Sequence, residues 1–344
     1  MRLLYVITIA YFAPPVLAFG PAFVSRSNRA GLAIFSGPPS TEHDVMAVSA
    51  PLKFIGPYPC LALRFPNLGT SAQRSRNETG VSLDFVVDTA ANTNTIQGPV
   101  VAELQLKSTG QFALPGVSAT GSIPGGETFL LGDTQLDGMG PDLFMIDLTA
   151  SVLPVSNPAA AGVLSLAFLQ CFPGGVEFDW ENRQFRFLSE TNASEKEGLQ
   201  MIPIERQPIT QLPLIQITIN NVELTALLDT GSPITIIHPD AAKRANIDVQ
   251  NVEANKSRNP FKSLFSQNDS QVLTIMGGDG KPTKLYPTKS AVEISMFGES
   301  VVYVGQVPGL AALQVKSPDV ILGTDVLKRR PKMILRVQQN EMWI

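Results

Sequence analysis

Residues 222–237 read VELTALLDTGSPITII, an apolar strand that runs directly into Asp229 and Thr230, then a turn of small residues and a second apolar strand. Residues 81–96, VSLDFVVDTAANTNTI, repeat this order without a gap, so that Asp88 precedes Asp229 by 141 residues. An internal repeat of this kind indicates a duplicated structural unit. We therefore expect two similar lobes, each presenting an aspartate at the end of a buried strand.

The repeat extends well beyond the aspartates. Each copy continues through a proline, which suits the first turn of a helix, and later contains an apolar block and a pair of strands joined by a polar turn. The expected helices are Pro99 to Leu106 and Pro239 to Ile247, the apolar blocks are residues 162–169 and 319–327, and the closing strand pairs are residues 176–187 and 333–344. This pattern predicts an all-β fold. The second copy is 17 residues longer between its aspartate and its apolar block, and we place the extra residues in a surface loop over 251–271.

The composition limits the kinds of partner and catalytic site that the chain can have. Only 16% of the 344 residues are charged and the net charge is −4, so no basic surface recommends nucleic acid as a partner. Two histidines, His43 and His238, and two cysteines, Cys60 and Cys171, are too scattered for a zinc site, and we expect no metal and no cofactor. We interpret the cysteines as two buried thiols, with a single disulfide as the alternative.

The amino-terminal residues are typical of a targeting segment. Residues 1–18 combine a charged start, an apolar run and a small-residue exit, which predicts a secretory signal peptide, and residues 19–50 are expected to form a transit-like or flexible leader. The junction of Ala18 and Phe19 resembles the bipartite presequences of algae with secondary plastids, which implies delivery to that plastid. The alternative is a secreted or vacuolar protein. We expect no membrane association once the signal peptide is removed.

A pair of aspartates at strand ends suits acid–base catalysis. Two carboxyl groups about 3 Å apart cannot both ionise, so they share one proton. The ionised member can take a proton from a water molecule while the protonated member hydrogen-bonds the carbonyl group of a substrate. If the two lobes bring Asp88 and Asp229 together, the pair could hydrolyse a peptide bond without a metal or a covalent intermediate.

The segment Leu227 to Ser232, together with Val320 to Gly323, closely resembles the active-site strand and the later apolar element of retropepsin-like aspartic proteases. The resemblance implies a bilobal aspartic-protease fold with two pseudo-symmetric β-barrel lobes and a cleft between them that holds a polypeptide substrate. It also implies that Asp88 and Asp229 are the catalytic residues. On this basis we expect an N-terminal lobe over 51–190, a linker over 191–198 and a C-terminal lobe over 199–344.

The same resemblance implies roles for the neighbouring residues. Thr89 and Thr230 would join the two active-site loops by hydrogen bonds, the N–H groups of Ala90 and Gly231 would point at the carboxylates, and Ser232 would hydrogen-bond Asp229. Hairpin flaps would cover the cleft. The flap candidates are Gly125 and Gly126 in the glycine-rich stretch 116–126, and Gly277 and Gly278 in the stretch 276–280.

The first copy departs from the family pattern at two positions. Ala90 stands where the second copy has Gly231, and Ser165 stands where it has Gly323. Alanine keeps its N–H group, so its hydrogen bond to the carboxylate can survive, whereas Ser165 is expected to crowd the packing beneath the active-site loop. Two functions therefore stay open: an aspartic endopeptidase, and a weak or inactive pseudo-protease that serves as a peptide-binding module. We expect a monomer, because the chain itself supplies both halves of the dyad; dimerisation of a single competent lobe through Asp229 is disfavoured.

Overall fold

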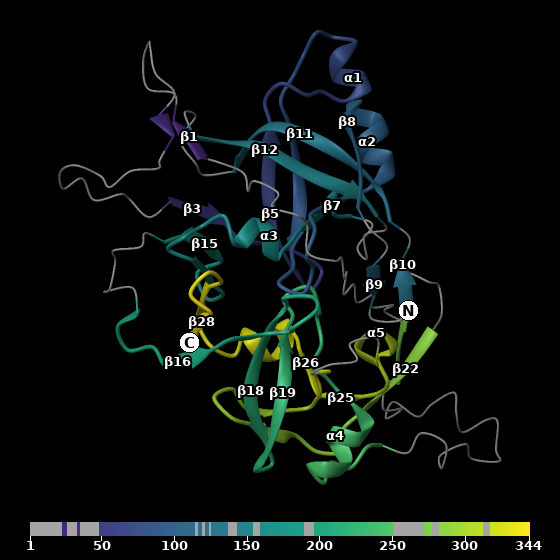
Figure 1. Ribbon diagram of the computed structural model, residues 1–344, viewed down its shortest axis with the longest axis vertical. Helices are drawn as coiled ribbons and strands as arrows, with labels where there is room; N and C mark the ends of the chain where they lie inside the picture. Colours follow the sequence, from purple (N-terminus) through teal and green to yellow (C-terminus); the bar gives the residue numbers. More distant parts are fainter. Residues whose placement is uncertain are drawn as a thin grey trace, which may run out of the picture.

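The chain folds into two β-rich lobes joined by a third sheet. The computed structural model describes residues 23–25, 33–34, 48–113, 116–118, 121–123, 125–136, 143–153, 159–188, 196–250, 272–276, 282–311 and 317–344. The first lobe lies above the second in Figure 1, and the sheet that joins them lies between the two. The prediction of an all-β, bilobal fold is confirmed.

A ten-stranded sheet forms the body of the first lobe. Its strands are β1 (Phe23–Ser25), β2 (Ala33–Ile34), β4 (Lys53–Ile55), β5 (Tyr58–Phe65), β6 (Val81–Val87), β7 (Thr95–Ile96), β8 (Lys107–Phe112), β11 (Glu127–Leu136), β12 (Leu143–Val152) and β13 (Gly162–Leu164). They are ordered β2-β1-β12-β7-β13-β6-β5-β11-β8, with β4 paired to β5. The short helices are α1 (Ser71–Arg74), α2 (Gly98–Leu104) and α3 (Leu166–Leu169), and a separate hairpin consists of β9 (Gly116–Ser118) and β10 (Gly121–Ile123).

The second lobe repeats this plan. Its strands are β17 (Glu205–Arg206), β18 (Pro213–Ile219), β19 (Val222–Leu228), β20 (Ile236–Ile237), β21 (Leu273–Met276), β22 (Pro282–Pro287), β23 (Val292–Ile294), β24 (Gly298–Ser300), β25 (Tyr303–Val304) and β26 (Val320–Leu322). They are ordered β21-β22-β25-β20-β26-β19-β18-β23-β24, with β17 paired to β18. The helices are α4 (Pro239–Arg244), α5 (Pro308–Ala311) and α6 (Thr324–Leu327).

The duplication predicted from the sequence is visible in the pairing. The run β12-β7-β13-β6-β5 of the first sheet corresponds to β25-β20-β26-β19-β18 of the second. In both lobes the strand that precedes the aspartate is parallel to the strand of the later apolar block, with Val87 opposite Leu164 and Leu228 opposite Leu322. The last three residues of β6 and β19 and all of β13 and β26 are buried, which accounts for the apolar sequence that precedes each aspartate. Each aspartate therefore leaves its sheet at the same place.

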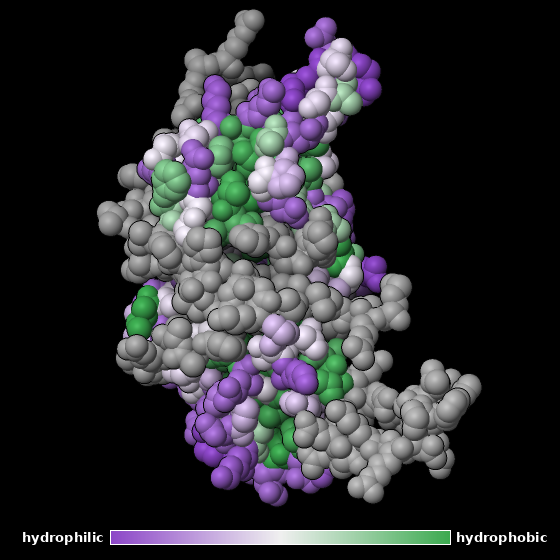
Figure 2. Space-filling model, turned by 90° about the vertical axis from the view of Figure 1, so that its right-hand side faces the viewer, coloured by the Kyte–Doolittle hydropathy of each residue, from purple (hydrophilic) through white to green (hydrophobic). Residues whose placement is uncertain are grey.

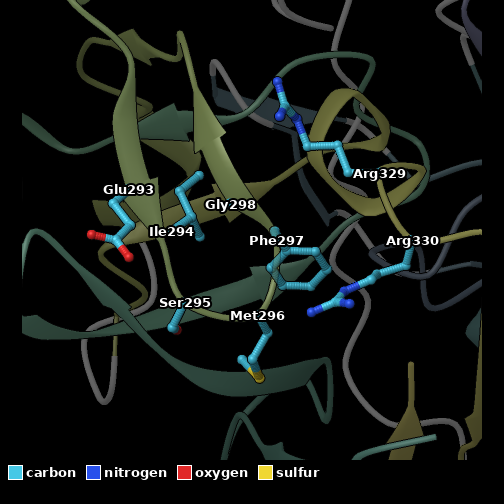
Figure 3. Close-up of a pocket in the computed structure, with 8 residues that line it drawn as sticks. All are labelled: Glu293, Ile294, Ser295, Met296, Phe297, Gly298, Arg329 and Arg330. Carbon is cyan, nitrogen blue, oxygen red and sulfur yellow. The ribbon is translucent and has the colours of Figure 1, made fainter. Parts of the chain in front are cut away.

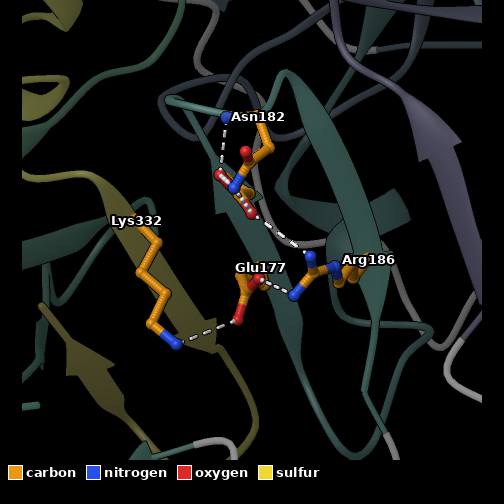
Figure 4. Close-up of polar contacts among 5 residues, drawn as sticks. Glu177, Asn182, Arg186 and Lys332 are labelled. Carbon is orange, nitrogen blue, oxygen red and sulfur yellow. Dashed lines mark hydrogen bonds and ion pairs between the residues drawn. The ribbon is translucent and has the colours of Figure 1, made fainter. Parts of the chain in front are cut away.

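A six-stranded antiparallel sheet joins the lobes. It consists of β3 (Val48–Pro51), β14 (Val176–Asp179), β15 (Gln184–Phe187), β16 (Met201–Pro203), β27 (Lys332–Arg336) and β28 (Glu341–Trp343), in the order β16-β28-β27-β14-β15-β3. The central pair, β14 and β27, comes from different lobes. Figure 4 shows the polar contacts there: Glu177, only 1% exposed, accepts a 2.9 Å hydrogen bond from Arg186 and forms a 3.9 Å ion pair with Lys332 of the other lobe.

One apolar core runs through both lobes and the joining sheet. Within the joining sheet, Trp180 stacks on Phe178 at 4.9 Å between ring centroids, and Phe178 meets Phe185 edge-on at 5.0 Å. Trp180 is 8% exposed and thus packs within this core. On the face shown in Figure 2, apolar residues gather in the upper and the lower part of the molecule, bordered by hydrophilic ones.

Several expectations about the chain can be compared with the described residues. Strand β3 of the joining sheet starts at Val48, and the predicted leader contributes β1, which pairs with β12, and β2, which pairs with β1. The stretches 1–18, 189–195 and 251–271 lie outside the described residues. Cys60 and Cys171 are free thiols, with Cys60 buried and Cys171 partly exposed. Within the described part, none of the helices has the length and apolar character needed to cross a membrane.

Candidate active site

Strand pairing positions both aspartates. The backbone N–H of Asp88 donates to the carbonyl of Leu164 at 2.9 Å, and that of Asp229 donates to the carbonyl of Leu322 at 3.1 Å. Each aspartate is thus held by the last residue of the neighbouring parallel strand, and beyond it the chain turns away from the sheet. Both residues are buried, with Asp88 2% and Asp229 0% exposed.

Four hydrogen bonds between Thr89 and Thr230 and their surroundings join the two active-site loops. The N–H of Thr89 donates to the hydroxyl of Thr230 at 3.1 Å, and the N–H of Thr230 donates to the hydroxyl of Thr89 at 3.0 Å. Each hydroxyl then donates at 2.7 Å to the other lobe, Thr89 to the carbonyl of Leu228 and Thr230 to that of Val87. The expected cross-lobe role of these two threonines agrees with this geometry.

The two loops bring their aspartates into one site. A Cβ atom added to Gly231 would lie 2.3 Å from Cγ and Oδ2 of Asp88, so the carboxylate of the first lobe rests directly on the loop that carries Asp229. Asp88 and Asp229 also interact electrostatically, and each alters the pKa of the other. Since only a residue without a side chain fits this approach, Gly231 is a requirement of the pairing and not a feature of the turn alone.

The hydrogen bonds around the two carboxyl groups differ. The N–H of Ala90 donates to Oδ1 of Asp88 at 2.7 Å, as predicted, so the alanine preserves this contact. The N–H groups of Gly231 and Ser232 face Asp229, but neither oxygen of Asp229 accepts a hydrogen bond of normal geometry within the described part of the chain. A hydrogen bond stabilises the charged form of a carboxyl group. The negative charge is therefore favoured on Asp88 and the proton on Asp229.

Burial changes the acidity of the pair. Desolvation raises the pKa of Asp88 to about 7 despite its bond from Ala90. The pKa of Asp229 is raised well above the ordinary aspartate value. Desolvation is the largest cause, and the negative charge of Asp88 is the second. One proton is consequently retained by the pair at a pH where isolated aspartates have lost theirs, as a pair acting as acid and base requires.

These shifts predict a pH-dependent stability. Because the folded protein holds protons at the dyad more tightly than the unfolded chain, the free energy of unfolding should fall as the pH rises from about 4 to about 7. We expect this fall to be smaller in a variant that carries both Asp88→Asn and Asp229→Asn, since asparagine does not titrate. Urea unfolding of both proteins across this pH range measures the difference. Parallel curves for the two proteins would show that the dyad does not titrate in this way.

Ser232 does not make its expected bond. Its hydroxyl donates to the carbonyl of Ile234 at 2.7 Å and not to Asp229, so it stabilises the turn that follows the dyad. The expectation of a hydroxyl contact to the carboxylate was wrong because the turn brings a closer backbone acceptor to Ser232. The carbonyl of Ser232 in turn accepts the N–H of Thr324 at 2.8 Å, which ties the loop to helix α6.

Ser165 also differs from the expectation, since it is accommodated without crowding. Its N–H and its hydroxyl both donate to Oδ1 of Asn94, at 2.9 and 3.0 Å, and the hydroxyl accepts the N–H of Ala167 at the start of α3. In the second lobe the N–H of Gly323 donates to the hydroxyl of Thr235 instead. The first lobe thus pairs Ser165 with Asn94 where the second lobe pairs Gly323 with Thr235. In each lobe the two residues form a hydrogen bond with each other.

Replacing Ser165 or Gly323 should lower the free energy of unfolding. A Cβ atom at Gly323 would lie 2.4 Å from the carbonyl oxygen of Ile234, so we expect Gly323→Ser to destabilise the protein by about 1–3 kcal/mol. Ser165→Ala, which removes a helix cap, should cost about 1 kcal/mol. Chemical denaturation of both variants and the wild type provides the comparison. A Gly323→Ser variant as stable as the wild type would contradict the close approach.

The stretch predicted to form the flap of the first lobe contains two short strands, and its role as a flap stays a prediction. The strands β9 and β10 form an antiparallel hairpin within the stretch 116–126, and β10 lies beside α5 of the second lobe (Figure 1). Gly125 and Gly126 lie after this hairpin, at its base. A Cβ atom on Gly126 would lie 2.1 Å from the carbonyl oxygen of Val152, so this glycine permits close packing.

The corresponding stretch of the second lobe is only partly described. Strands β21 and β22 are antiparallel, with Met276 opposite Pro282. Gly277 and Gly278 lie outside the described residues. Their role as flap residues stays a prediction.

A further cross-lobe contact was missed by sequence reasoning. Nδ2 of Asn92, in the loop after Asp88, donates to the carbonyl of Thr210 in the second lobe at 2.7 Å. The loop that carries Thr210 is ordered by the buried Gln207, whose Oε1 accepts the N–H groups of Ile209 and Thr210 at 2.7 and 2.6 Å. Neither copy of the repeat predicts this contact, because the position of Asn92 is occupied by Pro233 in the second lobe.

The remaining polar residues take structural positions. His238 caps helix α4 by accepting the N–H of Asp240 at 3.3 Å. Among the residues that the structure describes, no three histidine, cysteine, aspartate or glutamate side chains gather as metal ligands would. The chemistry that the described site offers is that of the two carboxyl groups.

Comparison with known proteins adds to this picture. Residues 215–259, which contain Asp229 and the strands around it, match the family described as aspartyl protease. No curated protein sequence matches the chain. Among solved structures, basic 7S globulin from soybean is similar, with a TM-score of 0.42 and 11% sequence identity, over 86% of this chain and 95% of the globulin. The sequence around the second aspartate is therefore similar to that of aspartyl proteases, which supports a protease-like function.

Proposed function

We propose that this protein is an aspartic endopeptidase in which Asp88 and Asp229 together activate a water molecule. The observation that carries the proposal is the symmetric set of hydrogen bonds between Thr89 and Thr230, which holds two aspartates from different lobes in one buried site. Such a site has the two elements that acid–base hydrolysis needs, a shared proton and a rigid support for the groups that exchange it.

The asymmetry of the dyad gives each carboxyl group a role. Asp88, which receives the N–H of Ala90, is the ionised member and takes a proton from the water. Asp229, which keeps the proton, hydrogen-bonds the carbonyl oxygen of the scissile peptide and stabilises the negative charge that develops there. Proton transfer from the dyad to the departing amine then completes the hydrolysis. The substrate is a polypeptide that lies between the lobes under the β9–β10 hairpin.

A second function is favoured by one specific observation. Asp229 is 0% exposed and its oxygens have no hydrogen-bond partner of normal geometry among the described residues, whereas Asp88 has Ala90. A dyad in which one member is this strongly biased toward its neutral form can lose activity while the fold persists. The alternative is thus a peptide-binding module that keeps the lobes and the hairpin but does not cleave.

A cleavage assay separates the two functions. Purified protein without residues 1–18 is incubated with unfolded casein and with a peptide library between pH 3 and 8, with and without the aspartic-protease inhibitor pepstatin. New peptide termini that pepstatin suppresses would support the endopeptidase. Saturable peptide binding without new termini at any pH would support the binding module.

The quaternary state and the cellular route belong to the same proposal. We propose a monomer that enters the secretory route, with the secondary plastid as its destination and a secreted or vacuolar location as the alternative. Light scattering tests the monomer, since a dimer would favour the alternative in which two copies of the chain pair their Asp229 lobes. Imaging of residues 1–50 fused to a fluorescent protein tests the second part.

A further inference from the structure

Two adjacent arginines that follow helix α6 have no side-chain partner among the residues that the structure describes. Arg329 is exposed and Arg330 is partly buried. Neither side chain forms a hydrogen bond or an ion pair with any residue in the described part of the chain, and Nε of Arg330 is buried without a partner. A buried donor that is left without an acceptor is unfavourable, so something other than the protein is expected to satisfy it.

The turn at residues 328–331, which follows helix α6, is called the corner below. The first lobe contains an equivalent turn, which allows a comparison within the same chain. The N–H groups of Arg329 and Arg330 donate to the carbonyls of Val326 and Leu327. In the first lobe Cys171 and Phe172 make the equivalent backbone bonds to Phe168 and Leu169, and Pro173 follows there as Pro331 follows here. The backbone of this corner is therefore the same in both lobes.

The side chains at this corner differ in kind. Phe172 is 6% exposed and packs against Phe168 and Phe187, with ring centroids 5.3 and 4.2 Å away. The fold can thus be completed here by an aromatic cluster. Because the second lobe has, in the place of Phe172, a charged residue with no counterion in the described part of the chain, the stability of the fold does not explain Arg330.

Both arginines line a pocket of about 370 Å³ with the β23–β24 hairpin (Figure 3). Arg330 extends toward Met296 and Phe297 at the turn of this hairpin, and Phe297 is 5% exposed. Ser295 also lines the pocket, and its hydroxyl oxygen accepts the N–H of Thr218 at 2.8 Å, which leaves the hydroxyl proton available. Glu293, the one acidic lining residue, directs its carboxylate away from both guanidinium groups.

We propose that this pocket binds a small oxyanion, a carboxylate or phosphate group, through Arg330, with Arg329 and the hydroxyl of Ser295 as additional donors. Guanidinium groups present paired N–H donors that match two oxygens of one carboxylate or phosphate. The apolar side chains of Phe297, Met296 and Ile294 favour a ligand whose anionic group is attached to an apolar body. The site is separate from the Asp88–Asp229 dyad, so it does not depend on the proposed protease activity.

Isothermal titration calorimetry at constant ionic strength and pH 7 tests the proposal with three probes. Benzoate carries a carboxylate on an apolar ring, inorganic phosphate carries an oxyanion alone, and benzamide keeps the shape of benzoate without its charge. We expect saturable binding of at least one anion and none of benzamide. A preference for benzoate or for phosphate identifies the type of anion that the site takes.

Variants assign the binding to the arginine. Arg330→Gln should weaken anion binding by at least about tenfold, because it removes charge-assisted hydrogen bonds. Arg330→Phe copies the residue of the first lobe, keeps the corner packed and should also lose binding. Lys328→Gln is the matched control, since it removes the same charge from the same turn outside the pocket. The proposal is overturned if neither anion binds the wild type, or if both Arg330 variants bind as tightly as Lys328→Gln does.

Discussion

Replacement of either Asp88 or Asp229 by asparagine is expected to abolish most of the proposed cleavage. Asparagine preserves the size of the side chain but can neither accept a proton from water nor carry the shared one, so kcat/KM should fall by roughly 10²–10⁴-fold in each single variant. Because the two groups act as a unit, kcat/KM of the double variant should be only slightly lower than that of the less active single variant. Initial rates on a peptide substrate at the optimal pH provide the measurement.

The matched control for these variants lies on the same strand as Asp88. Asp84 is at the surface of β6, where it forms a 3.2 Å ion pair with Lys53. Asp84→Asn makes the same chemical change four residues earlier and should leave the rate unchanged. If Asp88→Asn and Asp229→Asn cleave as fast as this control, the dyad is not the catalytic group.

Gly231→Ala should cause the second large effect. The added methyl group would lie 2.3 Å from the carboxylate of Asp88, so either the carboxylate or the loop that carries Asp229 must move. A displacement of about 1 Å in a catalytic group costs on the order of 10²-fold in rate, and the overpacking should lower the free energy of unfolding by about 1–3 kcal/mol. Rate measurements and urea unfolding on the same preparation give both quantities.

The control is the reverse exchange in the first lobe. Ala90→Gly removes a methyl group and keeps the N–H that Asp88 accepts at 2.7 Å, so the variant should remain folded and active. The two exchanges have opposite expected outcomes although both concern the residue two places after an aspartate. Full activity of Gly231→Ala would mean that Asp88 does not depend on its contact with this loop.

The repeat made most of the fold predictable. The paired patterns around Asp88 and Asp229 correctly placed β6, β19 and the helices α2 and α4, since an apolar strand, a turn and a proline are local signals. The closing strand pairs also agree with β14–β15 and β27–β28. Strand β3 was not predicted, because it belongs to the joining sheet and pairs with β15, more than 130 residues later in the sequence.

The errors concern contacts between residues that are distant in sequence or packed beneath the loops. Ser165 was expected to crowd its neighbours, yet Asn94, 71 residues earlier, accepts both of its donors. Ser232 was assigned to Asp229, but the carbonyl of Ile234 is its acceptor. In both cases the residue types were compatible with several partners, and only the backbone path selected one.

The sequence by itself determined that the protein has two related halves and that each half ends a buried strand in an aspartate, because strand periodicity and repetition are written in neighbouring residues. The tertiary structure decided how those aspartates differ. The proton is favoured on Asp229 and the charge on Asp88 because both carboxyl groups are buried but only Asp88 accepts a hydrogen bond of normal geometry, from Ala90, among the described residues. It also left Arg330 without a partner among the described residues where Phe172 packs in the first lobe, a contrast between equivalent positions that depends on the surroundings of each side chain.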